Sequence, residues 1–273
     1  MNTITTVMMR ECVSRKHIIV PSLFPPSVVR TSFTDASLLF KEDVILPSPI
    51  AKTIRRQDTK AQANIPIGMA LTEGTLSPSL QALARGLFHC AAGYLQAIIN
   101  ASINKDTPLL TPTSHDALLR AYPLPRTEAP LPLEAFINTA SVFRIWTYQC
   151  GGDSVDGEPL CRPHCDPGLC TAMLLGSTPG LEINAVDTIR DNGFGDFRGD
   201  GGSSYNWSSI AAEEGDALLI NNTQLECCTG GIAKQLPHRV VAPQGQMGER
   251  INMVVELRAR HAKHIFALGG RST

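Results

Sequence analysis

The sequence predicts a mainly β protein with helices packed against the β core. Short runs rich in β-forming residues recur through the second half of the chain, separated by glycine, proline and asparagine. A helical spacing of apolar residues begins in the first half, behind Ser77. Together these observations place the β core in the C-terminal half and the helices before it.

The composition fits a globular chain and argues against two classes of partner. The 273 residues carry a formal net charge of −1, and 43% of them are apolar. There is no long run of one sign, so we expect neither nucleic acid nor a membrane as partner. Residues 1–10 lack the charged start and long apolar core of a secretion signal. We therefore expect a cytoplasmic protein, with a weak organellar transit peptide as the alternative.

The eight cysteines are expected to be free thiols, because a reducing compartment does not support a disulfide framework. Cys161, Cys165 and Cys170 lie close to His164, so a thiolate zinc site is an alternative. However, no two cysteines have the Cys-x-x-Cys spacing typical of structural zinc. We favour small buried hydrophobic side chains.

Prolines interrupt the first 60 residues, which leaves only short apolar runs there. His17–Val20 is a candidate strand. The segment Arg55–Gln62 is polar, and it predicts a solvated loop. Behind Ser77, Pro78 takes the first helical position, and apolar residues then recur at intervals of three and four. We expect an amphipathic helix of about five to six turns.

A second, shorter helix is expected after this one, over His115–Tyr122, within a proline-rich region. The alternation of apolar and polar residues then predicts a strand over Ser141–Tyr148. Residues 187–206 contain many glycines and aspartates, which favours a long loop inserted between two strands.

The chemistry is expected to lie around the triplet His164-Cys165-Asp166, which is set between prolines. In extended backbone, residues two positions apart point to the same side, so His164 and Asp166 can converge on one metal ion. The third candidate ligand is His238, at the start of a β-branched run. Two histidines and one carboxylate leave coordination positions open, and this set suits non-haem Fe(II).

The motifs that follow the triplet resemble those of a known enzyme family. They are Leu169–Leu175, a Pro179-Gly180 turn, Leu181–Ile183, Glu214–Asn222, Leu236–Val240 and Arg250–Val255. In this order, residues 141–258 resemble the isopenicillin N synthase-like branch of the 2-oxoglutarate and Fe(II)-dependent dioxygenases. The resemblance implies a double-stranded β-helix, a jelly-roll of two facing sheets, with N-terminal helices packed on it.

The resemblance also implies the cofactors and the reaction. Fe(II) would be the metal, and 2-oxoglutarate and O2 the co-substrates. The enzyme would oxidise a small organic substrate, most often by hydroxylation, with release of succinate and CO2. The implied metal ligands are His164, Asp166 and His238.

Three further residues are expected to bind the distal carboxylate of 2-oxoglutarate. Tyr148 stands where the resembled family has a tyrosine that contacts it. Arg250 is suited to hold it, because a guanidinium can form two parallel hydrogen bonds with a carboxylate. The family pattern here is Arg-x-Ser, but this chain has Asn252 in place of the serine. The longer amide can still donate, although it would displace the carboxylate unless Arg250 or Tyr148 shifts.

Two alternative functions remain open. The chain could be an Fe(II) oxidase of the same fold that does not use 2-oxoglutarate, which Asn252 favours, or a non-catalytic jelly-roll binding protein. The predicted divisions are residues 1–137 for a divergent N-terminal region with helices, 138–260 for the dioxygenase jelly-roll and 261–273 for a C-terminal tail.

Overall fold

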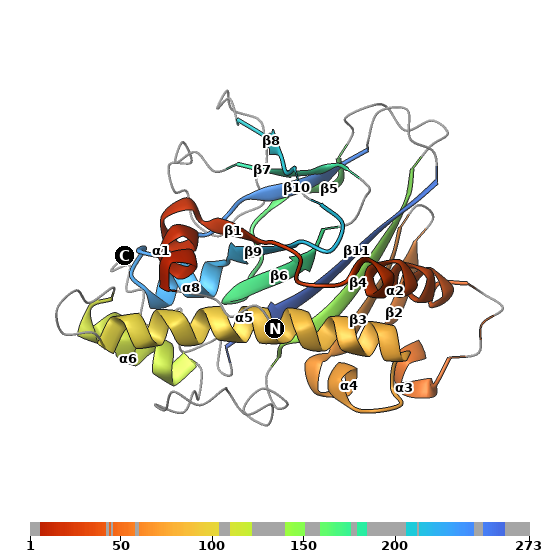
Figure 1. The fold of residues 1–273 in the computed structure, drawn as a ribbon, viewed down its shortest axis with the longest axis horizontal. Coiled ribbons are helices and arrows are strands. Elements are labelled where there is room, and N and C mark those ends of the chain that lie inside the picture. The colour runs from red at the N-terminus through yellow and green to blue at the C-terminus, as the bar shows by residue number, and fades with distance from the viewer. Residues whose placement is uncertain are drawn as a thin grey trace.

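Two antiparallel sheets form the core of the protein in a computed structural model (Figure 1). The structure describes residues 6–41, 44, 46–57, 60–103, 110–121, 140–150, 159–175, 179–184, 206–211, 213–242 and 248–259. The large sheet has the strand order β1-β9-β6-β11-β4-β3-β2, and the small sheet has the order β5-β10-β7-β8. The predicted fold class, mainly β with helices packed on a jelly-roll core, is confirmed.

The large sheet consists of β1 (His17–Val20), β9 (Ala217–Asn221), β6 (Cys170–Leu174), β11 (Gly248–Leu257), β4 (Val142–Cys150), β3 (Lys60–Pro66) and β2 (Ile54–Gln57). The small sheet consists of β5 (Pro159–His164), β10 (His238–Val241), β7 (Leu181–Ile183) and β8 (Ser208–Ser209). The helices within the described ranges are α1 (Thr6–Arg15), α2 (Pro26–Leu38), α3 (Ser48–Ala51), α4 (Ile67–Leu71), α5 (Pro78–Ile103), α6 (Pro112–Ala121) and α8 (Thr223–Cys228).

The long helix α5 packs along the outer face of the large sheet (Figure 1). Its apolar stripe is buried as the spacing predicts, and Leu83, Leu87 and Phe88 are fully buried. Ser77 caps the helix, because its hydroxyl accepts a hydrogen bond from the backbone N–H of Leu80 at 3.4 Å. The helix has 26 residues, about seven turns, and is therefore longer than the predicted five to six.

The inner face of the large sheet packs against the small sheet over β9, β6 and β11. Met173, Leu218 and Val254 point inwards from these strands, and Leu181 and Val240 of the small sheet join them in one apolar cluster. Since side chains alternate between the faces of a strand, the same strands serve this cluster and the helix-covered outer core. This part of the molecule is an ordinary two-layer sandwich.

Beyond β11, the inner face of the large sheet becomes polar. Two rows of paired residues cross β11, β4 and β3, one formed by Arg250, Tyr148 and Lys60 and the other by Asn252, Trp146 and Gln62. Lys60, Gln62 and Trp146 are half-buried, whereas Thr147, which points to the outer face, is buried. The apolar inner core therefore does not extend to these strands.

The predicted strand His17–Val20 is confirmed as β1, and the short helix predicted over His115–Tyr122 is confirmed in α6. The loop predicted over Arg55–Gln62 is wrong, because β2 and β3 pair there as an antiparallel hairpin at the sheet edge. The last three side chains of β2 are polar and exposed, so the sequence lacks the apolar alternation of a strand. The backbone pairing stabilises the strand instead.

Three strands that precede residue 137, namely β1, β2 and β3, belong to the large sheet. The predicted boundary between residues 137 and 138, the tail 261–273 and nearly all of the 187–206 insertion lie outside the described residues. Of the helices in the described part of the chain, none has both the length and the apolar character needed to cross a membrane.

Candidate metal centre

The structure brings His164, Asp166 and His238 together at one end of the small sheet. His164 ends β5, Asp166 follows it in a loop, and His238 begins β10 directly opposite His164. One potential ligand atom from each residue lies within 4.8 Å of the others. The Nε2 atoms of His164 and His238 lie 3.6 Å and 4.0 Å from Oδ1 of Asp166. The three side chains therefore converge, although His238 is far from the other two in the sequence.

Backbone carbonyls orient both imidazoles. Nδ1 of His164 lies 2.8 Å from the carbonyl oxygen of Arg162, and Nδ1 of His238 lies 3.1 Å from that of Leu236. Because a carbonyl only accepts, each Nδ1 must carry the proton and donate it. In the neutral ring the lone pair then sits on Nε2, which faces Asp166. This is the tautomer that a metal ion needs.

The loop that carries Asp166 is held by its neighbours on both sides. Thr223, at the start of α8, donates to the carbonyl oxygen of Asp166 from its backbone N–H at 3.0 Å. Two residues on, Gly168 lies against β11, where a Cβ atom would come within 2.5 Å of the carbonyl oxygen of Leu257. Only glycine fits this close approach. The carboxylate is therefore placed by the fold.

The second oxygen of the Asp166 carboxylate has a protein partner. Thr171 donates from its hydroxyl to Oδ2 of Asp166 at 2.6 Å, and Asn222 in turn donates to the hydroxyl of Thr171 at 2.9 Å. Oδ1 remains directed towards the two histidines. We did not predict a role for Thr171 or Asn222 from the sequence. The available signal was the one polar residue within the otherwise apolar run Cys170–Leu174.

The three groups differ in protonation. Burial lowers the pKa of His238, and the nearby His164 lowers it further. Burial also opposes the charged form of His164, but Asp166 and Cys161 outweigh it and raise the pKa of His164 to about 10. Burial raises the pKa of Asp166, but the two histidines and Thr171 outweigh it, and the net pKa is well below its ordinary value. Asp166 is therefore ionised, and His238 is neutral.

The proposed co-substrate residues lie on the inner face of the large sheet. Arg250 on β11 is paired with Tyr148 on β4, and both are almost completely buried. The guanidinium donates from Nε to the carbonyl oxygen of Pro179 at 3.0 Å and from Nη1 to Oδ1 of Asn252. Asn252 thus holds Arg250 in place through its oxygen, and its amide nitrogen is left to donate to a carboxylate.

Cys161 lies beside the site, although the sequence favoured only a buried hydrophobic role for it. Its sulfur lies 3.9 Å from Nδ1 of His164. Burial raises the pKa of the Cys161 thiol, but His164, Lys60 and Tyr148 outweigh it, and the net pKa is lowered. All eight cysteines are free thiols, as expected. Within the described ranges no cysteine belongs to a cluster of metal-ligand type, which disfavours the thiolate zinc alternative.

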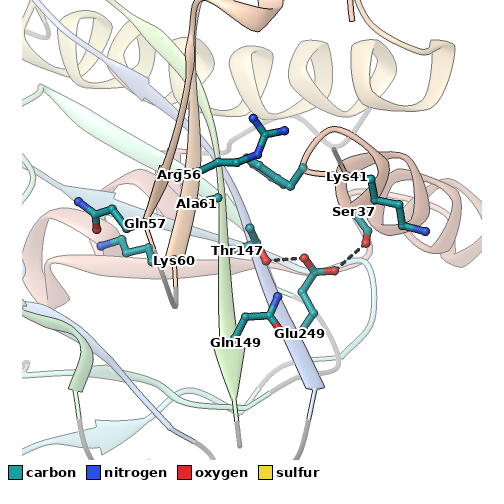
Figure 2. A pocket seen from close by; sticks show the side chains of 10 residues that line it. Ser37, Lys41, Arg56, Gln57, Lys60, Ala61, Thr147, Gln149 and Glu249 are labelled. Atoms are coloured by element: carbon teal, nitrogen blue, oxygen red, sulfur yellow. Dashed lines mark hydrogen bonds between the residues drawn. The ribbon is translucent and has the colours of Figure 1, made fainter. Parts of the chain in front are cut away.

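A pocket of about 360 Å³ lies elsewhere, on the outer face between α2 and the strands β3, β4 and β11 (Figure 2). Lys41, Arg56 and Glu249 are among the residues that line it, and Glu249 accepts hydrogen bonds from the hydroxyls of Ser37 and Thr147. None of the residues named above as candidate metal or co-substrate ligands lines this pocket.

The donor set of the cluster fits a divalent transition metal. The raised pKa means that His164 is protonated without metal, so binding of the ion would displace its proton. The cluster then offers two neutral imidazole nitrogens and one carboxylate oxygen from one side, which suits Fe(II) with open positions opposite. The backbone carbonyls behind both imidazoles and the hydroxyl of Thr171 behind the carboxylate supply the hydrogen bonds that ligating side chains usually have. His164, Asp166 and His238 would hold the ion.

No protein-family model matches this sequence, and no curated protein matches it. Solved structures do match over almost the whole chain. A candidate oxygenase from Shewanella oneidensis is 17% identical, with a TM-score of 0.65, over 95% of this chain and 87% of that one. Such a likeness shows a shared fold.

Two further structures have the same fold and were solved in complex with 2-oxoglutarate, also called alpha-KG. A dioxygenase for auxin oxidation from Arabidopsis thaliana, in complex with 2-oxoglutarate, is 14% identical, with a TM-score of 0.63, over 94% of this chain and 88% of that one. A full-length protein from Neurospora crassa, in complex with alpha-KG, is 13% identical, with a TM-score of 0.57, over 94% of this chain and 79% of that one. The fold implied by the sequence resemblance is thereby confirmed.

Proposed function

We propose that this chain, which has the fold of the 2-oxoglutarate- and Fe(II)-dependent oxygenases, is itself a dioxygenase of this type. It would oxidise a small organic substrate and release succinate and CO2. The observation that carries the proposal is the convergence of His164, Asp166 and His238, with both Nε2 atoms directed at Oδ1 of the carboxylate. Bound Fe(II) would supply the activation of O2 on which the oxidation depends.

The protein residues would position the reactants. His164, Asp166 and His238 would take one side of the ion and leave the other side to the reactants. The guanidinium of Arg250 would bind the distal carboxylate of 2-oxoglutarate, with Asn252 and Tyr148 as further donors. Burial of Arg250 and Tyr148 would strengthen these contacts, because little water competes with them there.

The choice of 2-oxoglutarate has two supports. The Arabidopsis and Neurospora neighbours were solved with this co-substrate. In addition, Oδ1 of Asn252 accepts a hydrogen bond from Nη1 of Arg250. The amide therefore lies beside the guanidinium, and it need not displace a carboxylate that Arg250 holds. We infer hydroxylation as the reaction outcome, since it is the commonest one in the resembled family.

Anaerobic spectroscopy of the purified protein tests the proposal. Addition of Fe(II) and then 2-oxoglutarate should produce a weak visible charge-transfer band, and the Arg250→Ala variant should lose this band but retain the metal. A metabolite-extract screen should then find fractions that stimulate the release of succinate. Substrate oxidation without succinate release would favour the Fe(II) oxidase alternative. If neither a band nor turnover appeared and His164→Ala changed nothing, the protein would be a non-catalytic binding protein.

A further inference from the structure

The inner face of β4, β3 and β2 carries positive charge beside the candidate active site. The polar side chains on this face include Arg55, Lys60, Gln62, Asn64, Arg144 and Trp146. Arg144 forms an ion pair with the buried Glu256 at 3.1 Å. Among the residues that the structure describes, no carboxylate forms an ion pair with Arg55 or Lys60. This face therefore has an excess of cations.

The polarity of this face is unexpected for the inside of a sandwich. Inner faces of packed sheets are normally apolar, as Met173 and Val254 are beneath the small sheet. On β4 and β3, however, Trp146, Gln62 and Lys60 are polar or amphipathic and only half-buried. Such side chains favour contact with a polar ligand over contact with an apolar layer.

Aromatic rings hold the ammonium group of Lys60. Its Nζ atom lies 4.2 Å from the ring centroid of Trp146 and 5.3 Å from that of Tyr148, and the two rings are stacked with an interplanar angle of 16°. This cation–π contact limits the motion of a flexible side chain and leaves N–H donors for another partner. Lys60 also borders the outer pocket, but Figure 2 shows it with Gln57 on the opposite side of the hairpin from Arg56. Its charged end therefore belongs to the inner face.

This ammonium group also lies close to the candidate co-substrate anchor, Arg250. Lys60 is paired in register with Tyr148, and Tyr148 with Arg250. A molecule bound over the rings beside Lys60 would thus be next to the co-substrate anchor.

We propose that the inner face of β4, β3 and β2 binds the substrate, and that the substrate is a small organic anion whose charged group is bound by Lys60. The rings of Trp146 and Tyr148 contact its carbon skeleton, while Arg250 remains with the co-substrate. A carboxylate and a phosphate share the chemistry that Lys60 recognises. The inference rests on the proposed function, because it assigns the substrate of that same site.

Trp146 allows binding to be measured without turnover. The chain contains two tryptophans, so a Trp207→Phe variant reports on Trp146 alone. This variant is loaded with Zn(II), which does not support oxidation, and calorimetry measures the binding of the metal. It is then saturated with 2-oxoglutarate so that Arg250 is occupied, and calorimetry measures this second binding step. Acetate, hexanoate and benzoate are then titrated, each against its neutral amide, and phenyl phosphate is titrated separately.

We expect at least one anion to change the emission of Trp146, and its neutral analogue to bind much more weakly. Lys60→Met should weaken binding of the anion about tenfold or more, and Lys60→Arg should restore most of it. Lys41→Met is the matched control, since Lys41 lines the outer pocket, and it should leave the affinity within about twofold. The preference between benzoate and phenyl phosphate identifies the charged group.

Three results would overturn the inference: equal binding of acids and amides, equal effects of Lys60→Met and Lys41→Met, or no response to any anion up to its solubility limit. The calorimetry separates these results from a failure of the proposed function. If the protein bound metal and 2-oxoglutarate but no anion, only the assignment of the substrate would fail. If it bound neither metal nor 2-oxoglutarate, the proposed function itself would fail.

Discussion

Towards the β4 side of the large sheet, the two faces differ in character although the same strands form both. Where helices cover it, the outer face of β4 and β11 is apolar, as illustrated by Phe143 and Val255, which are fully buried. The inner face of those strands carries Arg144, Trp146 and Arg250, together with the candidate co-substrate site. Because side chains alternate along a strand, one backbone serves packing on one side and chemistry on the other.

This difference implies that stability and function can be changed separately. Substitutions on the outer face should lower the free energy of unfolding and leave the ligand affinities of the folded protein unchanged. Substitutions on the inner face should change the ligand affinities and leave the free energy of unfolding nearly unchanged. The following substitutions test that contrast, one in the core between α5 and the outer face and the others in the candidate site that the inner face borders.

Removal of a metal ligand should have the largest effect. His238→Ala should abolish tight Fe(II) binding, because one of three protein ligands is lost and its position is buried. The melting temperature of the metal-free protein should change little. Anaerobic calorimetry with Fe(II) measures the affinity, and His89→Ala, an exposed position on α5, is the control. Unchanged Fe(II) affinity in His238→Ala would remove this residue from the site.

A substitution that creates a cavity in the core on the outer side of the sheet should have the second largest effect. Leu87→Ala on α5 should lower the free energy of unfolding by about 2–5 kcal/mol, since Leu87 is fully buried against the core. Urea denaturation measures this change. Leu38→Ala, at a position that is 38% exposed, should cost less than about 0.5 kcal/mol. If Leu87→Ala also weakened Fe(II) binding by the folded protein, the two faces would not be independent.

The co-substrate anchor should be sensitive to shape as well as charge. Arg250→Lys keeps the positive charge but loses the planar pair of donors, so the affinity for 2-oxoglutarate should fall about 10- to 100-fold. Fe(II) affinity should be unchanged. Calorimetry measures the two affinities separately, that for Fe(II) with the metal-free protein and that for 2-oxoglutarate with the metal-loaded protein. Arg239→Lys is the control, because Arg239 forms an ion pair with Glu182 on the small sheet. Equal losses in both variants would indicate a general effect of the substitution.

The hydroxyl behind the carboxylate should have the smallest effect of the four. Thr171→Val removes the hydrogen bond to Oδ2 of Asp166 and keeps the side-chain shape. Fe(II) affinity should fall about 10- to 100-fold, as for other groups that orient a metal ligand. Thr34→Val, on the exposed side of α2, is the matched control. A Thr171→Val variant with full affinity would show that the loop alone positions the carboxylate.

The contrast between the two faces also explains what the sequence could predict. The apolar stripe of α5 that packs on the outer face of the sheet could be predicted, because packing imposes a helical period on the residues from Leu80 to Ile98. His164 and Asp166 were visible because two positions of extended chain place them on one side. The convergence of His238 with them depends on the pairing of β10 with β5, which no local pattern encodes, and it was inferred from the order of the motifs.

The residues that sequence analysis missed share one property. Lys60 is in a segment predicted to be a loop, and Thr171 is in a run read only for its apolar residues. Each is defined by a contact outside its own strand: Lys60 contacts Trp146 of β4, and Thr171 contacts Asp166 in the loop before β6. A polar inner face removes the alternation on which strand prediction relies, so the strands at the polar edge of the sheet were the ones missed.

The place of β1 in the sheet has a consequence for how the chain is made. β1 forms one edge of the large sheet, and its partner β9 is synthesised about 200 residues later, judged from the paired residues His17 and Ile220. Until β1 docks, β9 presents unpaired backbone groups that another copy of the chain could join. Deletion of the residues up to Val20 should therefore expose the edge of β9 and produce intermolecular association.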